Sequence, residues 1–275
     1  MKSYIPVLTI AGSDSSGGAG IQADIKTMSA LGCYGMSAIT AITAQNTKGV
    51  SDIQGISPSV VAAQIDMVYS DIYPLAVKTG MLYSSGIVEA IVDRLINNQA
   101  KNIVVDPVMV STSGSQLISD DGIEAIVKLL FPIASVITPN CIEAKMLTGT
   151  EDVALQARRL KELGAKNILL KGGDTDSTDY KIDYLITENS TSLLSIKSSA
   201  IDTVNTHGTG CTLSSAIACY MAMGNSVEKS IKKAKRYITY ALFAGKDVKI
   251  GGGHGPVNHF FHPDKLKLRD YEDYN

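Results

Sequence analysis

The chain has 275 residues, of which 45% are hydrophobic and 19% charged, and its formal net charge is −2 at pH 7. This composition lies far from that of disordered chains, and the balanced charge excludes a surface built mainly to neutralise nucleic-acid phosphates. The apolar runs fall short of the roughly 20 residues that cross a bilayer, and the chain shows no secretory signal pattern. We therefore expect a cytoplasmic protein without a nucleic-acid or membrane partner.

Short strand-type runs and helical patterns alternate along the chain. The strand-type runs lie at 7–11, 37–43, 76–79, 102–106, 135–138 and 167–171. A helical pattern follows Ser57 and Pro58, with apolar residues at Val61, Ile65 and Val68, and similar patterns cover 88–95 and 123–130. Strands that alternate with helices need crossover connections, which predicts an α/β fold with a mostly parallel sheet and helices on both faces.

The second half of the chain departs twice from this alternation. Residues 180–199 read as two strands around a polar turn, which predicts a small antiparallel hairpin at the margin of the sheet. Two helices are predicted after Gly208, over 212–223 and 227–244. No linker composition interrupts the chain, so we predict a single domain over 1–268 and a frayed polar tail over 269–275.

A glycine-rich loop, Gly12–Gly20, joins the first strand to a helical pattern. It lacks the lysine of a phosphate-binding P-loop and the G-x-G-x-x-G spacing of a dinucleotide site. Small residues at the carboxyl end of a strand let a ligand approach the backbone, although a plain connecting turn has the same composition.

The strongest local signal is the run 205–211, NTHGTGC, which precedes an apolar helix. Backbone N–H groups at the positive end of a helix can hold an anion such as a phosphoryl group. Cys211 would lie at the helix N-terminus, where the pKa of a thiol is commonly lowered. A glycine-rich turn beside a buried structural cysteine is the alternative.

Seven blocks together resemble a known family. They are 12–27 (GSDSSGGAGIQADIKT), 43–47 (TAQNT), 78–82 (KTGML), 106–110 (DPVMV), 138–143 (TPNCIE), 171–173 (KGG) and 205–211 (NTHGTGC). In this order and spacing they resemble the hydroxymethylpyrimidine/phosphomethylpyrimidine kinases of thiamine biosynthesis, in the ribokinase-like superfamily. The resemblance implies a three-layer α/β/α fold with eight to ten strands, ATP across the carboxyl edge of the sheet, and a homodimer.

The resemblance also implies roles for individual residues. It places Gln45 on the amino-pyrimidine of the substrate, with Asp24, Met81 and Val108 around it, and Cys211 beside the attacking hydroxyl. The phosphoryl group would lie on the loop of Gly208, Thr209 and Gly210. Magnesium would lie at Asp106 and Glu143, and the nucleotide phosphates at Lys171, Asn140 and Thr206. Taken singly, Gln45 could be a solvated cap, Asp106 a strand-end turn, Glu143 a helix-terminal acid and Lys171 a solvated lysine.

The resemblance implies an ATP- and Mg²⁺-dependent kinase that phosphorylates 4-amino-5-hydroxymethyl-2-methylpyrimidine and then its monophosphate. A pyridoxal or pyridoxine kinase of the same superfamily is the first alternative, because its substrate is also a flat ring with a hydroxymethyl group. Gln45 and the NT pair before His207 favour the pyrimidine. A metabolite-binding protein without catalytic activity is the second alternative, and the joint presence of Asp106, Glu143 and Cys211 argues against it.

Overall fold

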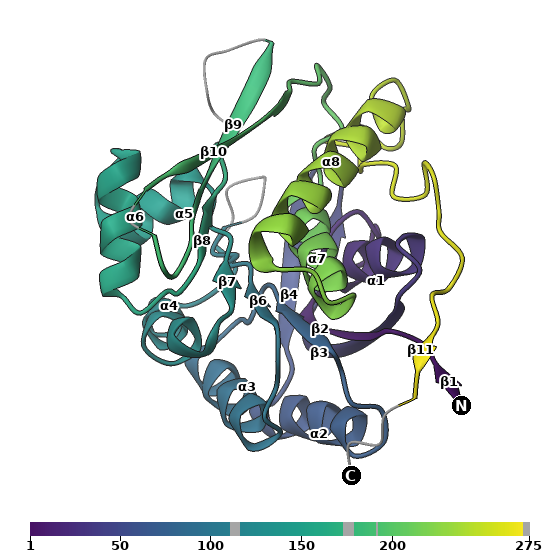
Figure 1. Cartoon of the computed structure of the whole chain (residues 1–275), viewed down its shortest axis with the longest axis vertical. Coiled ribbons are helices and arrows are strands. Elements are labelled where there is room, and N and C mark those ends of the chain that lie inside the picture. The colour runs from purple at the N-terminus through teal and green to yellow at the C-terminus, as the bar shows by residue number, and fades with distance from the viewer. Residues whose placement is uncertain (111–115, 173–178, 191, 272–275) are drawn as a thin grey trace.

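A central sheet with helices on both faces organises the structure, a computed structural model that describes residues 1–110, 116–172, 179–190 and 192–271 (Figure 1). This architecture confirms the predicted α/β class and its three layers. Among the described residues, no helix is both long and apolar enough to cross a membrane.

Nine strands form the sheet within the described residues, in the spatial order β10-β9-β8-β7-β6-β5-β2-β3-β4. Their bounds are β2 (Pro6–Asp14), β3 (Tyr34–Asn46), β4 (Gly49–Gly55), β5 (Ala76–Thr79), β6 (Ile103–Val105), β7 (Val136–Ile137), β8 (Ile168–Leu170), β9 (Tyr180–Ile186) and β10 (Leu194–Ser199). The predicted hairpin is confirmed, because β9 and β10 pair antiparallel at one edge. The sequence did not indicate β4, which pairs antiparallel with β3 and forms the opposite edge.

Alternate residues of the strands face two helical layers. On β2, Leu8 and Ile10 belong to one apolar core and Val7 to the other. On β6, Val104 belongs to the same core as Val7, whereas the residues on either side of it belong to the core of Leu8. The period of two along a strand requires this division.

The helices divide between these two cores. On the first face lie α2 (Pro58–Tyr69), α3 (Ser85–Asn97), α4 (Asp120–Ala125), α5 (Cys141–Thr148) and α6 (Val153–Glu162). On the second face lie α1 (Gly20–Ala30), α7 (Thr209–Ala222) and α8 (Val227–Gly245). The predicted helix near residue 123 continues beyond α4 as a π-helical turn, Ile126–Leu130, and a 3₁₀ turn, Phe131–Ile133.

The two ends of the chain meet beside the sheet (Figure 1). Lys2–Ser3 (β1) pair antiparallel with Arg269–Asp270 (β11). The prediction of a frayed tail is therefore wrong at Arg269 and Asp270, because their backbone groups find partners at the N-terminus. Residues 272–275 lie outside the described residues.

The carboxyl ends of the parallel strands deliver most of the polar side chains of interest to one edge. Asp14 ends β2, Asp106 follows β6, Thr138 follows β7 and Lys171 follows β8. Residues that follow neighbouring parallel strands meet at the same edge of a sheet, which is where open α/β sheets bind ligands.

Candidate active site

A cleft opens at this edge, between the strand ends and the N-terminus of α7. Its lining includes all but one of the residues that the sequence proposed for the site. These lining residues are Gln45, Met81, Asp106, Val108, Asn140, Glu143, Lys171, Thr206, Gly208, Thr209, Gly210 and Cys211. Their individual roles remain predictions, but the fold brings residues more than 160 positions apart to one cavity.

Asp24 departs from the prediction that it lines the substrate pocket. Its carboxylate is fully buried and accepts hydrogen bonds from Thr9 Oγ1 (2.6 Å) and Ser215 Oγ (2.7 Å). The Lys78 ammonium forms an ion pair with it, with Nζ 2.8 Å from Asp24 Oδ2. The carboxylate oxygens are therefore committed to protein partners, and the residue of this pair that reaches the cleft lining is Lys78, which the sequence analysis missed.

The N-terminus of α7 lies in the cleft lining, where the glycines predicted an anion site. Gly208 caps the helix at φ +76°, and a Cβ on it would lie 1.8 Å from the carbonyl oxygen of Gly18. Thr212 N–H donates to the Gly208 carbonyl and Thr209 N–H to that of Thr206. Thr212 is the first residue of α7 whose N–H donates to a carbonyl four residues earlier. The N–H groups of Gly210 and Cys211 precede it, so they are available to an anion at the positive end of the helix.

Gly210 differs in conformation from Gly208. It lies within α7, and the positive φ of this loop occurs at Gly208. A Cβ on Gly210 would lie 3.4 Å from Lys171 Nζ and 3.6 Å from Asp106 Oδ2. Both distances are ordinary van der Waals separations, so these charged groups lie beside the helix end and a methyl group would fit against them.

The Cys211 thiol is partly accessible from the cleft, but the expectation of a lowered pKa is wrong. Desolvation by the surrounding protein raises the pKa to about 11, against the opposing charge of Lys78. The carboxylates of Asp24 and Asp106 raise it further. These effects outweigh the helix N-terminus, so most of Cys211 is a neutral thiol at physiological pH.

Asp106 lies at the centre of a buried polar cluster beside the first turns of α7. Lys171 Nζ donates to Asp106 Oδ1 at 2.8 Å, Thr138 Oγ1 donates to the same oxygen at 3.0 Å, and Ser214 Oγ donates to Oδ2 at 3.2 Å. Burial opposes ionisation of Asp106, but the charges of Lys171 and Lys78 outweigh it and lower the pKa. Asp106 is thus a carboxylate in the folded protein.

Glu143 is placed by the first turn of α5. Its Oε2 accepts from Asn140 N–H, and its own N–H donates to Asn140 Oδ1, both at 2.8 Å, which makes a capping box. Burial and then the charge of Asp106 raise the pKa of Glu143 to about 7, although Lys171 Nζ lies 3.9 Å away and opposes the rise. The cap commits the Asn140 side-chain oxygen, so only its NH₂ group can reach a nucleotide as predicted.

A second pair that the sequence analysis missed joins the two glycine loops. Asp14 Oδ2 accepts from the N–H groups of Gly18 and Ala19, and it lies 2.8 Å from His207 Nε2. A carboxylate can only accept, so Nε2 carries the imidazole proton that points at Asp14. Both residues lie inside quoted blocks, but only the contact between the blocks distinguishes them from ordinary loop residues.

Gln45 lies in the cleft lining, at the register shift of β3 that follows Ala44. Its Oε1 accepts a hydrogen bond from Thr43 Oγ1 at 3.1 Å, which fixes the carboxamide on that side. Met81 and Val108 supply an apolar wall beside Ala41 and Leu117. A fixed carboxamide next to an apolar wall is suited to a flat ring that bears hydrogen-bonding groups.

These features define the class of the protein. An open α/β sheet with an anion site at a helix end, an acidic pair and a lysine beside it, and a pocket for a small ring next to a thiol describes a small-molecule kinase.

The comparisons with known proteins agree with this class. Residues 14–258 match the family model of phosphomethylpyrimidine kinase. A thiamine biosynthesis bifunctional protein from Geobacter sulfurreducens is 47% identical over 96% of this chain, which spans only 54% of that longer relative. A hydroxymethylpyrimidine/phosphomethylpyrimidine kinase from Rhizobium meliloti is 45% identical over 92% of this chain and 96% of its own. The chain belongs to the phosphomethylpyrimidine kinase family and is a phosphotransferase.

A solved structure supports the fold. The pyridoxal kinase from Staphylococcus aureus, in complex with AMP-PCP and pyridoxal, superposes with a TM-score of 0.84. It is 32% identical and covers 97% of this chain and 99% of its own. The ribokinase-like fold that the resemblance implied is thereby confirmed.

Proposed function

We propose that the chain transfers the γ-phosphoryl group of ATP to the hydroxymethyl oxygen of 4-amino-5-hydroxymethyl-2-methylpyrimidine, and then phosphorylates the monophosphate to the diphosphate. The observation that carries this proposal is that Gln45 lines the same cleft as the Cys211 thiol and the N-terminus of α7. A carboxamide offers both a donor and an acceptor, which matches an exocyclic amine next to a ring nitrogen. The names of the curated relatives support the same substrate.

ATP is proposed to place its terminal phosphate at the N-terminus of α7. The N–H groups of Gly210 and Cys211, together with the Lys171 ammonium, would stabilise the charge on the transferring group. The complex of a structural relative with the ATP analogue AMP-PCP supports a nucleotide as the phosphoryl donor.

Asp106 and Glu143 fit a magnesium ion. Mg²⁺ takes one or two carboxylates, phosphate oxygens and waters. These two carboxylates already converge on one cation, since Lys171 Nζ lies 2.8 Å from Asp106 Oδ1 and 3.9 Å from Glu143 Oε2. A bound Mg²⁺ would neutralise phosphate charge, and the chain's part is to orient the two carboxylates through Thr138, Ser214 and the α5 cap.

Cys211 is proposed to take the proton of the attacking hydroxyl. As the hydroxymethyl oxygen bonds to phosphorus, the bond from phosphorus to the ADP oxygen breaks, and the hydroxyl proton passes to the sulfur. With a pKa of about 11, only a small fraction of Cys211 is thiolate at neutral pH. Phosphoryl transfer through a loose transition state needs little deprotonation of the nucleophile, so a small fraction suffices.

Phosphorylation of pyridoxal is the second candidate, because the superposed relative is a pyridoxal kinase with pyridoxal in its complex. Release of ADP measured side by side with hydroxymethylpyrimidine and with pyridoxal decides between them. We expect kcat/KM to be higher for the pyrimidine. Preferential use of pyridoxal would reassign the enzyme, and release of ADP with neither ring would contradict both functions.

We further propose that the enzyme works in the cytosol as a homodimer, as the family resemblance implies. Sedimentation velocity at micromolar protein concentration tests the assembly, and a single species with the mass of one 29.2 kDa chain would contradict it.

A further inference from the structure

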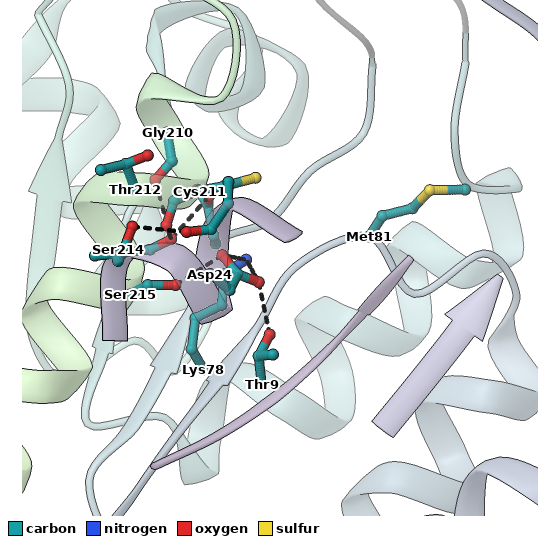
Figure 2. A network of polar contacts seen from close by, with 12 residues as sticks. Thr9, Asp24, Lys78, Met81, Gly210, Cys211, Thr212, Ser214 and Ser215 are labelled. Atoms are coloured by element: carbon teal, nitrogen blue, oxygen red, sulfur yellow. Dashed lines mark hydrogen bonds and ion pairs between the residues drawn. The ribbon is translucent and has the colours of Figure 1, made fainter. Parts of the chain in front are cut away.

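Two consecutive serines of α7 hold two different ion pairs. Ser214 Oγ donates to Asp106, which pairs with Lys171, and Ser215 Oγ donates to Asp24, which pairs with Lys78. Each carboxylate also accepts from a threonine, Thr138 on Asp106 and Thr9 on Asp24. The helix end therefore rests on two similar clusters of Ser, Asp, Lys and Thr, and Figure 2 shows Ser215, Asp24, Lys78 and Thr9 together.

The spacing along α7 assigns the clusters to different positions of the cleft. Residues four apart lie on the same face of a helix. Ser214 thus lies one turn below Gly210, and a Cβ built on Gly210 would come within 3.4 Å of Lys171 Nζ. Ser215 lies one turn below Cys211 by the same rule. The cluster of Asp24 and Lys78 therefore supports the thiol, whereas that of Asp106 and Lys171 supports the phosphoryl site.

The sheet fixes the direction of Lys78. Thr9 on β2 and Lys78 on β5 are register partners in adjacent parallel strands, so both side chains leave the sheet on the face where Asp24 lies. A Cβ on Gly80 would lie 2.8 Å from Lys78 Nζ, which shows how closely the backbone surrounds the ammonium. Lys78 has no exposed side-chain surface, yet it contributes to the lining of the cleft.

The two clusters differ in exposure. Lys171 retains 15% of its side-chain surface, so it can turn toward a nucleotide, whereas Lys78 and Asp24 are both at 0%. An ion pair without solvent contact costs more to desolvate than an exposed one and is weak evidence of a purely stabilising role. The charges of Lys78, Asp24 and Asp106 shift the pKa of the Cys211 thiol. The charge of a Cys211 thiolate in turn raises the pKa of Lys171.

We propose that Lys78 is a positioning residue for Cys211: Asp24, which is held by Ser215, fixes the ammonium in the cleft lining that it shares with the thiol, where its charge favours the thiolate that takes the proton of the acceptor hydroxyl. The catalytic part of this inference rests on the proposed function. The effect on the thiol itself does not, and it can be measured without substrate.

The test is the pH dependence of alkylation of Cys211 by iodoacetamide, in which the thiolate sulfur displaces iodide. The extent of reaction at Cys211 is read by fragmentation mass spectrometry, which separates it from Cys219 on the same helix. Relative to wild type, Lys78→Met should slow alkylation at pH 8.5 by about threefold or more, since half a pKa unit corresponds to that factor. The surface variant Lys232→Met, which also removes one lysine, should match wild type.

Removal of Lys78 leaves Asp24 buried and unpaired, so the single variant could fail to fold. The double variant Asp24→Asn/Lys78→Met removes both charges and avoids this problem. Asp24 opposes Lys78 at the sulfur, but its effect is the smaller of the two, so we expect the double variant to react more slowly than wild type and faster than Lys78→Met. Thr9→Val removes one hydrogen bond to Asp24 but keeps both charges, so it should slow alkylation much less. If the double variant follows the wild-type pH profile, or if Thr9→Val slows alkylation as much as loss of Lys78, the role of Lys78 is structural and the proposal is wrong.

Turnover supplies the second measurement. In the folded double variant, kcat with hydroxymethylpyrimidine should fall about tenfold, while KM for ATP stays near that of wild type. Slower alkylation with unchanged kcat would contradict the catalytic role while leaving the kinase function intact. If the wild-type protein does not phosphorylate the pyrimidine, the proposed function is contradicted. The effect of Lys78 on the thiol is not, because alkylation is measured without substrate.

Discussion

The Asp14 carboxylate and the His207 imidazole lie 2.8 Å apart although 193 positions separate them in the chain. The contact fastens the loop after β2 to the loop before α7. A Cβ on Gly18 would come within 2.3 Å of the His207 ring, so the two loops pack directly against each other. The start of α7 therefore packs against a loop from the other end of the chain.

Asp14→Asn should destabilise the protein by about 1–3 kcal/mol at pH 7, because a buried carboxylate that accepts several hydrogen bonds loses its charge. Hydrogen bonds from His207 and from the loop backbone hold the pKa of Asp14 below its usual range despite burial. The stabilisation is then present above the unfolded pKa of 3.8 and is lost as the pH falls through the folded pKa. Urea unfolding of both proteins should show the difference shrinking below about pH 4; a constant difference would mean that ionisation is not its source.

Glu143→Gln tests a carboxyl group whose pKa is shifted in the opposite direction, upward. Burial raises the pKa of Glu143 from 4.5 in the unfolded chain to about 7 in the folded protein. The folded state binds more protons between these values, so the contribution of Glu143 to stability is present below pH 4.5 and lost as the pH rises through 7. In metal-free buffer with EDTA, wild type should lose stability relative to Glu143→Gln between pH 5 and pH 8. Parallel stability curves for the two proteins would count against the raised pKa.

Gln45→Met should weaken use of the pyrimidine by about 10- to 100-fold in kcat/KM, since an unpaired buried polar group costs about 1–3 kcal/mol. KM for ATP should not change, because the amide is proposed to contact the pyrimidine. Gln54→Met, a matched change on the exposed strand β4, serves as the control. Wild-type kinetics in Gln45→Met would remove Gln45 from the acceptor site.

Cys211→Ala should retain affinity for ATP and lose about 10²- to 10⁴-fold in the rate of phosphoryl transfer, the usual range for removal of a general base. Cys211→Ser keeps a polar group of similar size with a much higher pKa, so it should be nearly as slow. Single-turnover kinetics with saturating ATP measure both. Full activity in the serine variant would show that the residue positions the hydroxyl without taking its proton.

Gly208→Ala and Gly210→Ala form a matched pair on the phosphate loop. Gly208 has φ +76° and lies against the Gly18 carbonyl, so alanine there should cost more than the roughly 1–2 kcal/mol of the left-handed conformation and disrupt ATP binding. Gly210 is helical, and its Cβ would make near-ordinary contacts with Lys171 and Asp106, so alanine should be milder in stability. Thermal unfolding and nucleotide titration of both variants test the order. The reverse order would contradict the roles given to the two glycines.

The sequence alone determined the class of fold and the family. Strand-type runs near residues 7, 76 and 103 alternate with helical patterns, which predicts a mostly parallel sheet, and the order of the seven blocks identified the kinase family before any contact was known. Local patterns also located α7, because glycine before an apolar helix is a short-range signal. Strand β4 escaped notice because none of its residues is buried and they carry little apolar alternation.

Tertiary structure alone decided the chemistry of individual side chains. The sequence placed Asp24 in the substrate pocket, but burial without a counter-charge is so costly that its carboxylate pairs with Lys78, 54 positions away. A helix N-terminus by itself lowers the pKa of a thiol, yet desolvation by the surrounding protein raises that of Cys211. Desolvation and Coulomb interactions depend on what the fold brings within a few ångströms, and neighbours along the chain do not specify that environment.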